Sequence, residues 1–85
     1  MMENNLFQVN NYKKLIGINI KRAIEDKGYT QTSFAKEMDM PTSQINRYCL
    51  GKTSPSSEIF NNIAKQLDLS TAGLLYYTKN VDRAG

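Results

Sequence analysis

Residues 30–52 read TQTSFAKEMDMPTSQINRYCLGK, and their pattern decides the fold. Thr30 is a good N-cap, because its hydroxyl can accept a hydrogen bond from a backbone N–H one turn into a helix. A helix of about residues 31–38 is predicted by apolar side chains at helical spacing, namely Phe34, Ala35 and Met38. Pro41 lacks an N–H and has a fixed φ, so it suits the start of a second helix and not the interior of the first.

The second helix is predicted over about residues 42–50, with Gly51 at the position after it where a left-handed residue is least costly. One side of this helix is apolar and consists of Ile45, Tyr48 and Cys49. The other side carries hydrogen-bonding side chains and no acid: Thr42, Ser43, Gln44, Asn46 and Arg47. Such a face has the groups that read base edges in the major groove of DNA.

An ordered set of residues extends this pattern beyond the two helices. The set is Thr30-Gln31, Phe34-Ala35, Ile45, Gly51-Lys52 and Pro55, with Gly17–Ile20 upstream and Ile63-Ala64 and Leu74-Leu75 downstream. In this it resembles the phage repressor and Cro family, the lambda-repressor-like domains. The resemblance implies an all-α fold, a compact five-helix domain with its helix-turn-helix at the second and third helices. Asp39 stands where the family usually has glycine, and aspartate tolerates the left-handed region better than most residues.

The resemblance also implies roles for single residues. Thr42, Ser43 and Arg47 match base-reading positions, with Gln44 and Asn46 flanking them. Arg47 is the sharpest candidate, because a guanidinium can bond guanine with two hydrogen bonds. The alternatives are a phosphate contact or a surface ion pair for Arg47, and ordinary helix-start chemistry for Thr42 and Ser43.

Contacts to DNA phosphates are predicted on either side of the reading helix. Gln31 matches a family position at a helix N-terminus beside the DNA backbone, where the helix dipole favours a phosphate. Lys52 and Thr53 follow the second helix and are predicted to contact phosphates as well. The alternative for these two residues is a solvated loop.

One departure from the family concerns a buried ion pair between the first and third helices. The positions of its two partners are occupied here by Ile24 and Cys49, both apolar. Replacing both partners of a buried pair by apolar side chains is tolerated, whereas losing one partner is costly. We therefore expect Ile24 and Cys49 to touch in the core, and the Cys49 thiol to be poorly reactive.

From the sequence we expect a flexible N-terminal segment over residues 1–11, a helix-turn-helix domain over residues 12–77 and a C-terminal tail over residues 78–85. Asn11 is a plausible N-cap for the first helix, and Gly28 a natural residue after its end. A fourth helix is predicted to open near Ser56 and Ser57, and a short fifth helix to be capped by Ser70. The apolar residues of the N-terminal segment either dock on the body or a partner, or belong to a frayed end; they are Leu6, Phe7 and Val9.

In the family, the end of the domain often forms a two-fold dimer contact. The matching residues here are Leu74, Tyr76 and Tyr77, with aromatic rings suited to the centre of an interface. The alternative is that they complete the core of the monomer. For Leu74 this alternative is favoured, whereas for Tyr77 the interface is favoured.

Composition excludes several other functions. The 85 residues contain no histidine and one cysteine, which argues against zinc sites, intrachain disulfides and histidine-based catalysis. No metal, cofactor or small-molecule ligand is expected, and the chain is not expected to be an enzyme. No apolar stretch is long enough to span a bilayer and no signal peptide is evident, so a cytoplasmic protein is expected.

The net charge is +3, and the whole excess lies in residues 1–52, which contain the predicted helix-turn-helix. That placement suits a surface facing phosphates, although a charge of this size also suits any soluble surface. The sequence thus predicts a DNA-binding transcriptional regulator, most simply a dimeric repressor that reads a palindromic operator in double-stranded DNA. The alternative is a protein-interaction module of the same fold, of the antitoxin or anti-repressor type.

Overall fold

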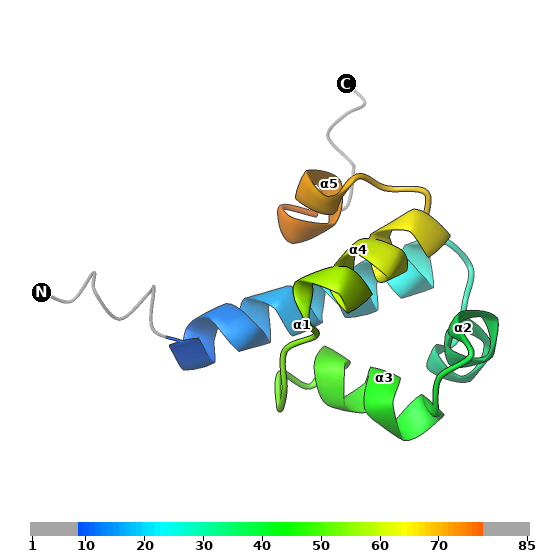
Figure 1. Ribbon diagram of the computed structural model, residues 1–85, viewed down its shortest axis with the longest axis horizontal. Coiled ribbons are helices and arrows are strands. Elements are labelled where there is room, and N and C mark those ends of the chain that lie inside the picture. The colour runs from blue at the N-terminus through cyan, green and yellow to red at the C-terminus, as the bar shows by residue number, and fades with distance from the viewer. Residues whose placement is uncertain (1–8, 78–85) are drawn as a thin grey trace, which may run out of the picture.

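The structure is a computed structural model that describes the backbone of residues 9–77 and the side chains of residues 12–77. Within these residues the chain forms five helices and no strand (Figure 1). The helices are α1 (Val9–Asp26), α2 (Gln31–Met38), α3 (Thr42–Cys49), α4 (Ser57–Gln66) and α5 (Thr71–Leu75). The predicted all-α, five-helix fold is confirmed.

A single core joins the apolar faces of all five helices. Its largest fully buried side chains are Phe34, Ile20, Ile24, Ile45, Ile63, Leu67 and Leu74. Burying a side chain of this size contributes roughly 1.5–3 kcal/mol. The ring of Tyr29 packs edge-on against Phe34, with ring centroids 5.1 Å apart, and closes the core beside the loop between α1 and α2.

Three helices begin at hydroxyl caps, two of which, Thr30 and Ser70, were predicted from the sequence. The Thr30 hydroxyl accepts from the Ser33 backbone N–H at 3.0 Å, and the Ser33 hydroxyl accepts in return from the Thr30 N–H at 3.0 Å. Ser56 caps α4 through the N–H of residue 59, and Ser70 caps α5 through the N–H of residue 73. These bonds satisfy N–H groups that have no partner within their helices.

The first helix starts earlier than predicted. It begins at Val9, so Asn11 lies inside α1 and does not cap it. Once a helix is nucleated and packed, each added residue gains one hydrogen bond, and this outweighs the weak helix preference of asparagine. The apolar residues Leu6 and Phe7 lie outside the described residues.

A close approach between α1 and α3 fixes how α3 sits on the domain. Gly17 is buried in the middle of α1, and a Cβ atom placed on it would lie 2.5 Å from the Tyr48 carbonyl oxygen and 2.7 Å from the Cys49 carbonyl oxygen. Only glycine therefore fits at this crossing, because the blocking atoms belong to the backbone of α3. Figure 1 shows α1 running through the centre of the molecule, with α3 packed along its lower edge.

Ile24 and Cys49, which replace the family's ion pair, are both buried in the core. Burial raises the pKa of the Cys49 thiol from 9.0 to about 11, against a smaller lowering effect of the Lys21 charge. Both side chains behave as apolar core residues, as expected, and their direct contact stays a prediction.

Candidate nucleic-acid interface

The corner between α2 and α3 is built by two residues of special geometry. Asp39 adopts the left-handed conformation, with φ 60° and ψ 43°. This agrees with the prediction from the glycine that the family usually has at this position. The N–H of Met40 donates to the Ala35 carbonyl at 2.9 Å, which closes the end of α2. Pro41 follows in the extended conformation and begins α3. The reversal places α3 beside α2 at one end of the molecule (Figure 1).

The helix α3 has one buried face and one exposed face, as predicted. The buried face consists of Ile45, Tyr48 and Cys49. The predicted base-reading residues form the other face, where Gln44 is half-buried and the rest are exposed: Thr42, Ser43, Asn46 and Arg47. Among the residues that the structure describes, the Arg47 guanidinium forms no ion pair, so its donors remain available to a partner.

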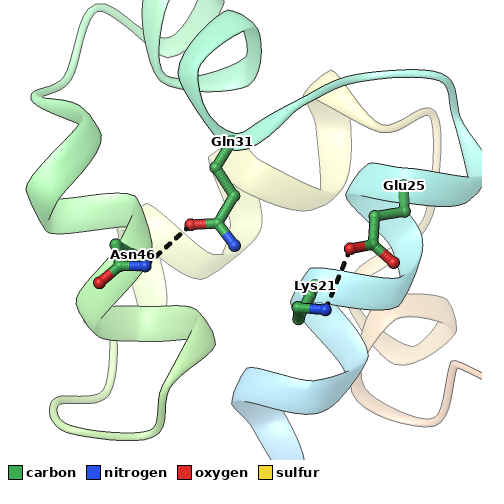
Figure 2. Close-up of polar contacts among 4 residues, drawn as sticks. All are labelled: Lys21, Glu25, Gln31 and Asn46. Atoms are coloured by element: carbon green, nitrogen blue, oxygen red, sulfur yellow. Dashed lines mark hydrogen bonds and ion pairs between the residues drawn. The ribbon is translucent and has the colours of Figure 1, made fainter.

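A hydrogen bond between α2 and α3 was not predicted from the sequence. The side-chain amide of Asn46 donates from Nδ2 to Oε1 of Gln31 at 3.2 Å (Figure 2). Gln31 is the first residue of α2 and is half-buried. The bond leaves the Gln31 NH₂ group and the Asn46 oxygen with bonding capacity to spare. Asn46 therefore orients Gln31 in addition to facing outward from α3.

The loop after α3 carries the other predicted phosphate contacts. Gly51 has φ +74° and ends the helix as predicted, and the Lys52 N–H donates to the Arg47 carbonyl at 3.0 Å. The Lys52 side chain is exposed and Thr53 is half-buried. The structure thus places Gln31 beside Asn46, within α3, and Lys52 just beyond the C-terminal end of this helix.

Comparison with known proteins agrees with this geometry. Residues 20–74, most of the chain, match the protein family described as Helix-turn-helix. The chain belongs to the helix-turn-helix family. This family match confirms the resemblance to lambda-repressor-like domains. The helix-turn-helix protein is therefore a DNA-binding regulator. The family is one of regulatory domains and not of enzymes. No curated protein and no solved structure matches the chain.

The three residues predicted at a dimer contact lie at the end of α5 or just after it in this helix-turn-helix protein, and their environments differ. Leu74 is fully buried in the monomer core, which is the alternative favoured for it from the sequence. Tyr77 is half-buried and donates its hydroxyl hydrogen to Asp26 Oδ2 at 2.8 Å. Burial and this bond raise the Tyr77 pKa. Tyr76, with 75% of its surface exposed, is the one of the three that faces solvent most fully.

The helices of this helix-turn-helix protein do not suit a membrane span. None of those within residues 9–77 has the length and apolar character needed to cross a bilayer. The longest, α1, has 18 residues and carries several charged side chains.

Proposed function

We propose that this helix-turn-helix protein is a sequence-specific transcriptional repressor that binds a palindromic operator as a dimer, with α3 in the major groove. The observation that carries the proposal is the outer face of α3. Its side chains are polar and contain no acid, and all but the half-buried Gln44 are exposed, while the opposite face of the same helix is buried. A helix held in this way by its apolar side presents its polar side in a fixed orientation.

Within this face, Arg47 is proposed to read a base. An arginine that bonds guanine O6 and N7 with two hydrogen bonds contributes about 1–3 kcal/mol of discrimination against other bases. Thr42 and Ser43 lie in the first turn of α3 and have short side chains, so they are proposed to report on bases directly against the helix or through water. Gln44 and Asn46 flank these positions.

Register on the DNA is proposed to come from phosphate contacts. Gln31 stands at the N-terminus of α2, where backbone N–H groups and the helix dipole favour an anion. Lys52 and Thr53 follow α3 and are proposed to contact the DNA backbone beyond the C-terminal end of this helix. Such contacts strengthen binding to any sequence and set the position from which α3 reads bases.

Repression is proposed to be steric. Two copies related by a two-fold axis would place two α3 helices in successive major grooves, about 34 Å apart, and occupy a site that polymerase needs. The exposed Tyr76 ring is proposed to contribute to the dimer contact, because a large exposed aromatic side chain is well suited to the centre of an interface. The protein is proposed to act in the cytoplasm.

Selection of bound sequences from a randomised DNA pool tests the proposal. The wild type is compared with Arg47→Ala and with Lys52→Ala, which removes a proposed phosphate contact and not a base contact. We expect a two-fold symmetric motif for the wild type. Arg47→Ala should relax one position in each half-site, and Lys52→Ala should weaken binding without changing the motif. No enrichment with the wild type at low salt would contradict the proposal.

The dimer is tested separately by sedimentation of the protein with and without operator DNA. Tyr76→Ala is expected to shift the protein towards the monomer. Tyr12→Ala removes another exposed tyrosine, on α1, and is expected to leave the association unchanged. Equal behaviour of the two variants would remove Tyr76 from the proposed interface.

A protein-interaction module remains the second candidate, because α1 exposes large apolar side chains. Tyr12, Leu15 and Ile18 are each exposed over 43–53% of their surface. Exposed apolar groups of this size are typical of protein contacts when they gather in one patch. The two candidates differ in salt dependence: affinity for DNA falls steeply with ionic strength, whereas affinity for an apolar partner does not.

A further inference from the structure

The loop that follows α3 lies directly against the backbone of α1. A Cβ atom placed on Gly51 would lie 2.9 Å from both Cα and Cγ of Lys14. The first part of the Lys14 side chain therefore packs on Gly51, one residue before Lys52. Lys14 itself remains exposed to solvent. Lys14 thus packs against the residue that precedes Lys52, at the end of the proposed reading helix.

A third lysine lies on the same side of α1. Lys21 follows Lys14 by seven residues, two turns of helix, which brings both onto one face. Between them lies Gly17, whose backbone touches the carbonyl groups of Tyr48 and Cys49 at the C-terminal end of α3. Lys14 and Lys21 therefore flank the point where α3 crosses α1.

The Lys21 ammonium is not held in place firmly. It pairs with Glu25 at 3.1 Å, and both side chains of this pair are more than half exposed (Figure 2). Ion pairs in such exposed positions contribute little to stability, so Lys21 can exchange the carboxylate for another anion. Among the described residues Lys14 has no acidic partner.

We propose that Lys14 and Lys21 extend the DNA-contacting surface onto α1 by neutralising phosphates beside the C-terminal end of α3. This proposal rests on the proposed DNA-binding mode. The N-terminal residues of a recognition helix contact base edges, so its other end and the neighbouring segments face a phosphate strand. Lys14 and Lys21 on α1 and Lys52 in the loop would supply the positive charges for this strand.

A structural role for the two lysines would have a different signature. Cations near the C-terminus of a helix stabilise it through its dipole, even in the absence of DNA. In that case Lys14→Gln and Lys21→Gln would lower the stability of the free protein and leave its salt-dependent DNA binding unchanged. Urea unfolding of each variant, measured beside DNA binding, separates the two roles.

The test measures affinity for a mixed-sequence duplex between about 50 and 200 mM salt, where phosphate contacts dominate binding. Each of Lys14→Gln and Lys21→Gln is expected to reduce the slope of log affinity against log salt by about 0.9. The loss of affinity across that salt range should become about threefold smaller for each contact removed. Arg22→Gln is the matched control, because it removes the same charge from α1 on a different side of the helix, and it should leave the slope unchanged.

The outcomes distinguish this proposal from the proposed function. If Lys52→Gln lowers the slope and the two α1 variants behave like Arg22→Gln, the extension onto α1 is wrong and the DNA-binding mode stands. If the wild type binds the duplex without salt dependence, the DNA-binding mode itself fails. A lowered slope in both α1 variants with unchanged stability supports the proposal.

Discussion

Replacing Gly17 by alanine tests the crossing of α1 and α3. Alanine favours an exposed helix interior by about 1 kcal/mol over glycine, so propensity alone predicts a more stable protein. The structure predicts the opposite, because the new Cβ would lie 2.5 Å and 2.7 Å from two backbone oxygens of α3. Restoring ordinary contact requires α3 to move by about 1 Å, and overpacking of this kind costs typically 1–3 kcal/mol.

Because both blocking atoms are backbone, we take the upper part of that range. The net loss of stability is then about 2 kcal/mol after the gain in propensity. For a domain of this size, such a loss lowers the melting temperature by roughly 8–16 °C. Thermal unfolding followed by circular dichroism measures it, and a Gly17→Ala variant that melts at or above the wild-type temperature would refute the reasoning.

A second readout separates displacement of α3 from simple loss of stability. Gly28 has φ +88°, and a Cβ atom placed on it would meet no neighbouring group within 4 Å. Gly28→Ala therefore introduces only the strain of a left-handed conformation, about 1–2 kcal/mol. Both variants should be destabilised. Only Gly17→Ala should also lose DNA affinity at a temperature where both remain folded, because only that substitution moves α3.

Three further predictions concern single residues. Asp39→Gly should stabilise the protein by roughly 0.5–1 kcal/mol in urea unfolding, because relief of left-handed strain exceeds the added freedom of the unfolded chain; a loss would contradict this. Cys49 should react slowly with a polar thiol reagent until the protein unfolds. Its pKa is raised from 9.0 to about 11, so the unfolded thiol ionises first and stability should fall as pH rises through this window. Cys49→Ala should reduce that fall, and rapid labelling of the folded protein would oppose the prediction. Tyr77→Phe should cost about 1 kcal/mol or less through the lost bond to Asp26, and sedimentation should show no change in association.

Sequence patterns predicted the elements of the fold better than their contacts. The caps at Thr30 and Ser70, the start of α4 near Ser56 and the left-handed Asp39 depend on local chemistry, and the structure has them where the sequence predicts. The start of α1 was predicted too late in the chain, because helix extension depends on packing of the whole helix and not on one capping residue.

The contacts that were not predicted from the sequence join distant segments of the chain. Glycine is unfavourable inside a helix, so Gly17 could have been noticed in the sequence as a position with a special role. That this role is the close approach of α3 could be seen only from how the two helices cross. The bonds between Gln31 and Asn46 and between Asp26 and Tyr77 join residues 15 and 51 positions apart. No periodicity relates such pairs. Leu74 differs from these pairs, because its place in the core was favoured from the sequence and its complete burial agrees.

The packing of Gly51 on Lys14 has a consequence for how substitutions can change DNA affinity. The atoms of Lys14 nearest the glycine are its backbone N, its Cα and its Cγ, which glutamine, methionine, arginine and glutamate also possess. The fit of the loop therefore depends on Gly51 and hardly on which long side chain occupies position 14. A single substitution there can alter the charge beside the reading helix while the fold is left unchanged, so binding strength and folding can vary independently at this position.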